Sequence, residues 1–245
     1  MAETTPHLAP IVVLLFLGAV FVTGVSLLIL LYGAVRHSKS YVRIGGGVAL
    51  SIVACYLLLL CSVSLASSEK DLPPGGWKYF CEIDCHIGYS VSGVQTTSVI
   101  GPEMRQESAH GQFVIVRLKI WFDEHTISPN RGDGPLTPNA RRVALVDASG
   151  RTYAPYTEGE AELARVNGDA GSLRQPLRPG QSFAKDLLFD VPNGTSGLRL
   201  LITEDDPETL LIIGHENSLL HRKIYLSLDS APRITREISS LAPGN

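Results

Sequence analysis

The reactive side chains of this sequence are concentrated in one short run, Cys81-x-x-x-Cys85-His86. If the chain turns between the two cysteines, their Cα atoms come within disulfide reach, whereas in an extended strand they would lie about 13 Å apart. Disulfides persist outside the cytoplasm. We therefore expect a structural disulfide between Cys81 and Cys85, located where a folded domain begins.

The same residues have two alternative uses. Two thiolates and an imidazole, from Cys81, Cys85 and His86, suit copper(I), or zinc(II) with a fourth ligand. A reversible dithiol is the other alternative, but the negative charges of Glu82 and Asp84 disfavour a thiolate beside them. If the disulfide forms, the protein needs no metal or other cofactor.

The remaining polar clusters have the composition of ordinary surface. The segment from His215 to His221 is predicted to be a solvated loop, and Glu204-Asp205-Asp206 a solvated turn. The sequence has no nucleophile elbow and no other complete catalytic constellation. We therefore expect a non-enzymatic protein.

Two apolar segments precede these residues. Residues 11–35 and 44–66 contain no Asp, Glu, Lys, Arg or His, and each exceeds the roughly 20 residues that span hydrocarbon. Both are predicted to be transmembrane helices, which together form a hairpin over residues 1–66. Because ion pathways are usually lined by ionisable groups, the hairpin is expected to be an anchor in the lipid bilayer rather than a transport pathway.

The charges around the helices predict the orientation. The link between them carries Arg36, Lys39 and Arg43, whereas the first ten residues carry no positive side chain. Positive loops stay on the cytoplasmic side. The N-terminus and the long C-terminal part are therefore expected outside the cytoplasm, on a multi-pass protein.

Downstream of the helices the composition changes. Residues 67–77 form a polar linker that includes two prolines and two glycines. From residue 78 the hydrophobic period becomes two, most clearly in 111–122, where alternate residues are apolar. A β domain is predicted over 78–228, followed by a loosely ordered tail over 229–245.

Several further segments of the domain have strand patterns. Turn sequences separate them, and one helix is expected near Glu158 to Val166. This organisation favours an all-β antiparallel sandwich attached to the helical hairpin. The predicted strands are 89–100, 111–122, 142–146, 183–191, 198–203 and 223–228.

Three motifs in this domain resemble the DUF4352 family. They are Leu145 to Tyr153, Leu177 to Ser182 and Leu187 to Pro192, within a similarity that covers about Tyr89 to Leu228. The resemblance implies an extracytoplasmic, immunoglobulin-like (telokin-like) sandwich on a membrane anchor, and a bacterial cell envelope. It implies a binding module without catalytic residues.

The arrangement also looks like subunit II of haem-copper oxidases, and Cys-x-x-x-Cys with a distant His looks like their copper-delivery proteins. The order of the copper residues differs, however, because here Cys81 and Cys85 open the domain. The net charge of −3 leaves no basic surplus for nucleic acid. We expect a protein partner in the membrane or periplasm. The alternative is a copper-binding or dithiol assembly factor of a respiratory complex that uses Cys81, Cys85 and His86.

Overall fold

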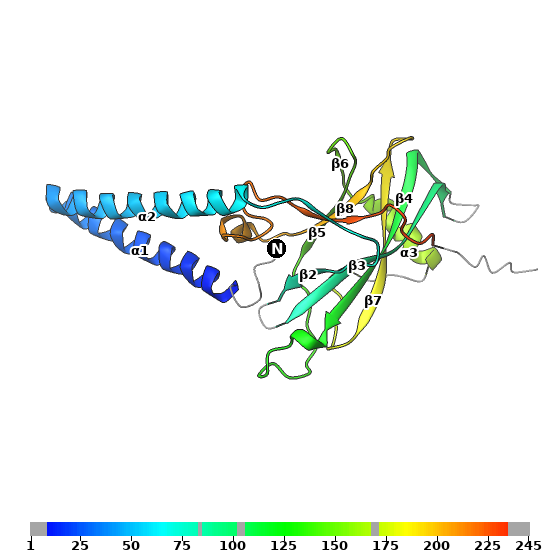
Figure 1. The fold of residues 1–245 in the computed structure, drawn as a ribbon, viewed down its shortest axis with the longest axis horizontal. Helices are drawn as coiled ribbons and strands as arrows, with labels where there is room; N and C mark the ends of the chain where they lie inside the picture. The colour runs from blue at the N-terminus through cyan, green and yellow to red at the C-terminus, as the bar shows by residue number, and fades with distance from the viewer. Residues whose placement is uncertain (1–8, 83–84, 102–105, 168–171, 235–245) are drawn as a thin grey trace, which may run out of the picture. The chain divides into compact units, whose positions relative to one another are not determined.

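The computed structural model describes residues 9–82, 85–101, 106–167 and 172–234 (Figure 1). The chain divides into two compact units. One contains residues 1–70 together with 204–223, and the other contains 71–203 together with 224–245. The predicted division at the linker stays a prediction. Residues 204–223 group with the helices, and hydrogen bonds join them to Tyr56 of the second helix and to Ser67.

The first unit begins with two helices, α1 (Ala9–Val35) and α2 (Lys39–Leu65), of 27 residues each. Both are long and apolar enough to cross a membrane, with mean hydropathies of 2.8 and 2.5. α2 starts at Lys39 rather than at the predicted residue 44, because a helix continues through polar residues of adequate propensity and does not end where the apolar run ends.

Close packing of the two helices depends on Gly45 of α2. A Cβ atom at this position would lie 2.6 Å from the backbone nitrogen of Leu30 and 2.7 Å from the carbonyl oxygen of Ser26. Only glycine permits this approach of the two backbones. Around the rest of their surfaces the helices expose large apolar side chains, including Leu50 and Leu58.

The second unit is a β-sandwich of two sheets. Sheet A has the strand order β1-β9-β8-β5-β6, and sheet B has the order β2-β3-β4-β7. The short helix predicted near residues 158–166 is present as α3 (Thr157–Asn167). The strands are β1 (Lys70–Leu72), β2 (Lys78–Cys81), β3 (His86–Ile100), β4 (Glu107–Asp123), β5 (Arg141–Val146), β6 (Thr152–Tyr153), β7 (Ser182–Val191), β8 (Arg199–Glu204) and β9 (Ile224–Ser227). Two single-turn 3-10 helices, η2 (Glu124–Thr126) and η3 (Pro207–Leu211), follow β4 and β8.

The core lies between the sheets. The alternation predicted in residues 111–122 is confirmed, because every second side chain from Val114 to Phe122 is fully buried. These side chains pack against alternate residues of β7 and against sheet A. The members from the other strands include Leu187, Phe189, Val191, Leu145, Leu200, Ile202 and Leu226.

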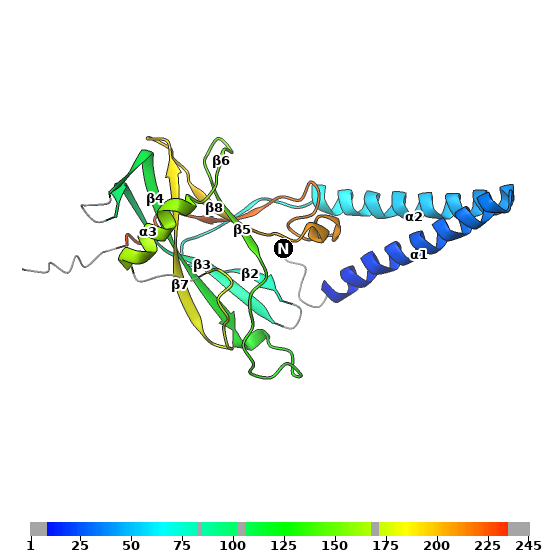
Figure 2. The same ribbon diagram turned by 180° about the vertical axis from the view of Figure 1, so that it is seen from behind.

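Helix α3 covers one part of the outer face of sheet B (Figure 2). Leu163 of α3 packs against Phe113, Ile115 and Leu188 in a second apolar cluster. Gly159 brings the helix close to the sheet, since a Cβ atom there would lie 2.5 Å from Leu188 Cδ2. The part of sheet B next to β2 does not belong to this cluster.

Part of the predicted tail belongs to the sandwich. Val94 of β3 donates from its backbone nitrogen to the carbonyl oxygen of Pro232 at 2.9 Å, and its carbonyl oxygen accepts from the nitrogen of Ile234 at 3.2 Å. Residues 235–245, on which the rest of this prediction falls, lie outside the described residues.

Candidate functional site

The candidate site lies on the outer face of sheet B, in the rows near β2. Directly opposite residues of neighbouring strands point to the same side of a sheet. Tyr79 of β2 lies opposite Gly88 of β3, and Gly88 lies opposite Trp121 of β4. The adjacent core residues Phe80, Ile87 and Phe122 point inward. Tyr79 and Trp121 therefore share the outer face, on either side of a glycine.

Trp77 completes an aromatic group over this glycine. The rings of Trp77 and Trp121 have centroids 5.4 Å apart, and the ammonium nitrogen of Lys119 lies 5.8 Å from the Trp77 ring. A Cβ atom at Gly88 would lie 2.9 Å from Trp77 Cε3, so the aromatic rings occupy the space that any other residue here would need. All three aromatic side chains are half-buried. We call Trp77, Tyr79, Trp121 and Lys119 the aromatic face.

A salt bridge lies beside the aromatic face on the same side of the sheet. Arg117 of β4 lies opposite Asp186 of β7 and donates to both of its carboxylate oxygens at 2.8 Å. The Asp186 side chain is buried, whereas that of Arg117 is partly exposed. The bidentate geometry holds the arginine fixed on the sheet surface.

The predicted cysteine pair lies one row away from the aromatic face. Cys81 ends β2 and is exposed, whereas Cys85 is 1% exposed and belongs to the core. The backbone nitrogen of Glu82 donates to the carbonyl oxygen of Cys85 at 2.8 Å. The two cysteine side chains thus differ in exposure. The disulfide between them stays a prediction.

The third predicted ligand, His86, follows Cys85 and is the first residue of β3. His86 lies opposite Cys81 on β2 and opposite Asp123 on β4. Its backbone nitrogen donates to Thr126 Oγ1 at 2.9 Å. The copper or zinc site of Cys81, Cys85 and His86 stays a prediction.

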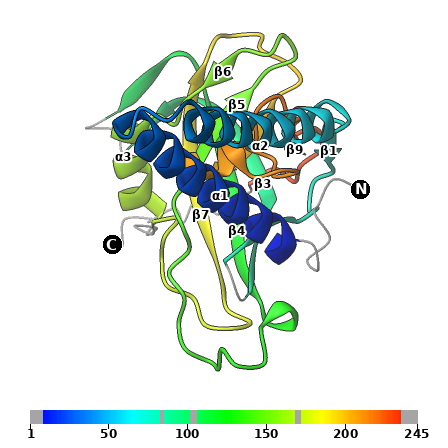
Figure 3. The same ribbon diagram turned by 90° about the vertical axis from the view of Figure 1, so that its left-hand side faces the viewer.

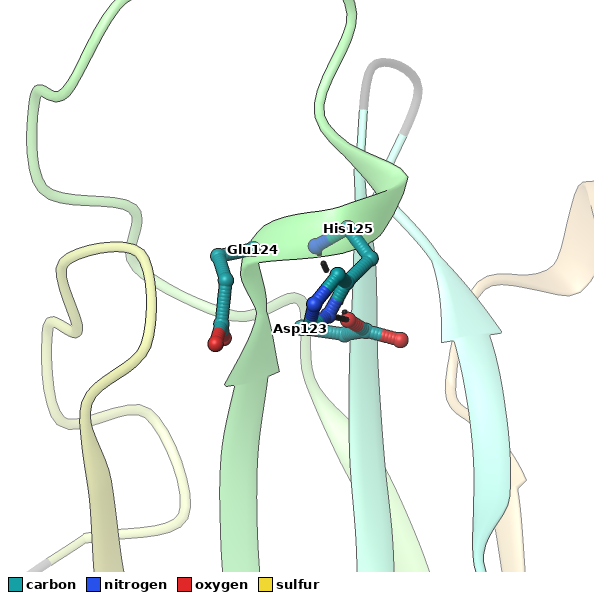
Figure 4. Close-up of side chains that lie close together, drawn as sticks. All are labelled: Asp123, Glu124 and His125. Atoms are coloured by element: carbon teal, nitrogen blue, oxygen red, sulfur yellow. Dashed lines mark hydrogen bonds and ion pairs between the residues drawn. The ribbon is translucent and has the colours of Figure 1, made fainter.

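Among the described residues, the close group of metal-ligand side chains is Asp123, Glu124 and His125 (Figure 4). Asp123 Oδ1 accepts from the backbone nitrogen of His125 at 3.0 Å and lies 3.1 Å from its Nδ1. Asp123 is therefore the N-cap of η2, the usual role of an aspartate before a helical turn. This cap accounts for the cluster without an ion.

Buried charges that the sequence did not predict lie on the inner side of β2. Lys78 Nζ donates to the carbonyl oxygens of Ile202 and Ile224, at 2.7 and 2.8 Å. Glu82 accepts from Arg141, whose guanidinium carbon lies 4.4 Å from the Phe80 ring. Both members of the Glu82–Arg141 pair are buried. The one available signal in the sequence was that Lys78 lies two residues before the apolar Phe80, and so on the same face of an extended strand.

A shallow hollow near the β5–β6 turn offers a further titratable group, Asp147. Its Oδ1 accepts from the Ser149 nitrogen at 2.8 Å, from Ser149 Oγ at 2.7 Å and from the Arg151 nitrogen at 3.0 Å. Its Oδ2 accepts from the Tyr153 hydroxyl at 2.8 Å. These bonds, first that of the Ser149 side chain, lower the pKa of Asp147 to about 2. The carboxylate closes the turn between β5 and β6.

The solvated loop predicted between His215 and His221 is not what the structure contains. Asn217, Ser218 and His221 are buried, while the neighbouring leucines are exposed. Within the predicted acidic turn, His215 Nε2 lies 3.2 Å from Glu204 Oε2, and Asp205 and Asp206 are exposed. The polar composition predicted a solvated loop, but the buried polar side chains form hydrogen bonds with protein groups instead of water.

Comparison with known proteins gives one matching family and several similar solved structures. The family described as "Domain of unknown function (DUF4352)" matches residues 84–208. No curated protein matches the chain. Several solved structures are similar at low identity and low TM-score, and three of them follow.

The first is a conserved hypothetical protein from Bacillus anthracis, 16% identical, with a TM-score of 0.39 over 51% of this chain and 86% of that one. The second is the secreted protein MPT63 from Mycobacterium tuberculosis, 10% identical, with a TM-score of 0.39 over 66% and 99%. The third is an uncharacterized β-sandwich protein from Clostridium difficile, 8% identical, with a TM-score of 0.36 over 66% and 95%.

Proposed function

The chain belongs to the DUF4352 family, and we propose that it is a membrane-anchored, non-enzymatic interaction module of the bacterial cell envelope. In this proposal α1 and α2 cross the inner membrane, and an immunoglobulin-like sandwich outside the cytoplasm binds a protein partner. The observation that carries the proposal is the aromatic face, an open group of tryptophan and tyrosine side chains on a rigid sheet.

The membrane part rests on the two long apolar helices and on the charges at their turn. Their large side chains are exposed to the surroundings, as expected for helices in contact with lipid. Arg36, Lys39 and Arg43 lie at the turn between the helices. By the positive-inside rule this turn is cytoplasmic, which puts the end of α2 and everything after it outside.

The binding part rests on the chemistry of the aromatic face. Tryptophan, tyrosine and arginine residues dominate the energetics of protein interfaces, and they act best when neighbouring groups hold them rigid. Here Trp77 and Trp121 pack on each other over Gly88, and Arg117 is fixed by Asp186. A flat sheet surface with aromatic and charged groups matches a protein surface better than it matches a small ligand, which requires a concave site.

Photo-crosslinking in intact cells tests the binding part. A photoreactive amino acid replaces Lys119, and the control carries it at Arg142, an exposed position of sheet A. We expect a discrete adduct from position 119 that disappears when Trp121→Ala is added, and no such adduct from position 142. If both positions give the same adducts, or if W121A leaves the adduct unchanged, the aromatic face is not the binding surface.

Protease protection tests the orientation separately. Protease added to spheroplasts is expected to digest the sandwich, because it lies outside, and to leave a fragment that contains the helices. If the sandwich is protected until the membrane is lysed, the proposed orientation is wrong.

A further inference from the structure

In the segment between β8 and β9, polar side chains are buried and large apolar side chains are exposed. Its polar residues Thr209, Asn217, Ser218 and His221 are at most 9% exposed. Its leucines are exposed instead: Leu210 by 44%, Leu211 by 39%, Leu219 by 47% and Leu220 by 62%. A loop in water has the reverse distribution, and a group of exposed large apolar side chains marks a contact surface.

The buried polar side chains of the segment have hydrogen-bond partners. Asn217 Nδ2 donates to the carbonyl oxygen of Glu204 at 2.8 Å and to Thr209 Oγ1 at 3.1 Å. Ser218 Oγ donates to the carbonyl oxygen of His215. His221 Nδ1 lies 2.7 Å from the carbonyl oxygen of Arg222. An unpaired polar group is costly in an apolar environment, so the pairing of these buried side chains is compatible with one.

The leucines lie in two pairs that a backbone hydrogen bond brings together. Leu210 and Leu211 end the 3-10 helix η3, and Leu219 and Leu220 lie at the next turn of the chain. The backbone nitrogen of Leu219 donates to the carbonyl oxygen of Leu210 at 3.2 Å, which joins the two pairs. The exposed acidic residues, Asp205, Asp206 and Glu208, precede the patch in the chain. We call Leu210, Leu211, Leu219 and Leu220 the leucine patch.

The segment is attached to α2, and both belong to the same compact unit (Figures 1 and 3). The hydroxyl of Tyr56, within the apolar part of α2, donates to the carbonyl oxygen of Leu211 at 2.7 Å. The backbone nitrogen of Arg222 donates to Ser67 Oγ at 2.8 Å, just beyond the end of the helix. These two bonds fix the segment along the last turns of α2.

The position of Tyr56 along α2 indicates how deep the attached segment lies in a bilayer that α2 crosses. It lies nine residues before Leu65, the end of α2, which corresponds to about 14 Å along the helix. One leaflet contributes about 15 Å of hydrocarbon. In a membrane-crossing α2, the main chain at Leu211 therefore reaches well into the outer half of the bilayer, and the bond to Leu211 satisfies a tyrosine hydroxyl that lipid could not.

We propose that residues 205–223 are a membrane-inserted segment, whose leucine patch is covered by acyl chains of the outer leaflet. This inference rests on the membrane anchorage proposed above. The patch continues the apolar surface of α2, and Tyr56 holds it at the depth of the acyl chains, whereas Asp205, Asp206 and Glu208 lie at the headgroup level. The sandwich is thereby attached to the membrane by a second contact besides the two helices.

Fluorescence quenching by brominated lipids tests this placement in the full-length protein. Single tryptophans are added by Leu219→Trp in the leucine patch, by Leu58→Trp on the exposed side of α2, and by Arg142→Trp on the sandwich. The proteins are reconstituted into phosphatidylcholine vesicles with bromine on the acyl chains, and the signal of Trp77 and Trp121 is measured in the unsubstituted protein as the baseline.

We expect L219W to lose fluorescence to an extent comparable with L58W, and R142W to lose none beyond the baseline. Adding Tyr56→Phe to L219W should reduce its quenching, because the bond to Leu211 is lost. If L58W is quenched but L219W behaves like R142W, the inserted segment is overturned while the anchorage stands. If L58W is not quenched either, the anchorage itself fails, and the inserted segment fails with it.

Discussion

The ammonium nitrogen of Lys78 lies 2.7 Å from the carbonyl oxygen of Ile202, and this contact joins the two sheets of the sandwich through its core. Lys78 belongs to β2 of sheet B, and Ile202 belongs to β8 of sheet A. A second bond, to Ile224 of β9, makes the same lysine a link to two strands of the opposite sheet.

Lys78→Met is expected to destabilise the sandwich. Methionine fills the space of the stem but leaves two buried carbonyl oxygens without their donor, which costs about 1–3 kcal/mol. The free energy of unfolding of the sandwich, measured by denaturant titration of the purified protein, should fall by this amount. Lys119→Met, at an exposed position, is the matched control and should change it by less than about 0.5 kcal/mol. Equal effects of the two substitutions would contradict the role of Lys78.

The Glu82–Arg141 pair should behave as one unit. Because both groups are buried, Arg141→Met leaves a carboxylate without its charged partner, at a cost of about 3–5 kcal/mol. The double variant with Glu82→Leu removes both charges and should be less destabilised than the sum of the two single variants. A double-mutant cycle of unfolding free energies measures this coupling, and strict additivity would mean that the pair is not coupled.

Asp147 should make the fold sensitive to acid. Its pKa in the folded protein is about 2, below the ordinary 3.8, because of the hydrogen bonds from Ser149 and its neighbours. The unfolded chain therefore binds more protons than the folded one between these values, and stability is lost as the pH falls from about 4 to about 2. Asp147→Asn should reduce the proton uptake on unfolding in this window by up to about one proton, measured from unfolding curves at several pH values.

The two cysteines of the predicted pair should differ in reactivity. In the reduced protein, Cys81 is expected to react with a water-soluble maleimide in the native state, whereas Cys85 should react only after unfolding, because it is buried. Peptide mass spectrometry distinguishes the two sites. Equal native reactivity would show that the β2–β3 turn is open. A Cys81–Cys85 crosslink in protein isolated without reductant would confirm the disulfide predicted from the sequence.

The elements that were predictable are those whose signal is local. Alternation from Val114 to Phe122 defines β4, and the turn after Asp147 requires an acceptor and the positive φ of Gly150. The two long helices were predictable because an uncharged apolar run of more than about 20 residues is typical of membrane-spanning helices. The start of the second helix was less accurate, because α2 begins at Lys39 rather than at residue 44.

The parts that were not predictable depend on contacts distant in sequence. Nothing near Lys78 indicates that its acceptors are Ile202 and Ile224, which lie in another sheet. The aromatic face was not predicted because Trp77 and Trp121 come together only through the register of β2, β3 and β4. The prediction of a solvated loop between His215 and His221 was wrong, because Asn217, Ser218 and His221 are buried through contacts that their polar composition does not indicate.

The leucine patch has a practical consequence for work with the isolated sandwich. A fragment that starts at Lys78 keeps residues 205–223 but loses Tyr56, so the segment has neither its hydrogen-bond donor nor its covering. Four leucines would then face water on a protein without detergent, a recognised cause of aggregation. Replacing this segment by a short glycine-containing turn between β8 and β9 should give a soluble, monodisperse sandwich suited to crystallisation and NMR.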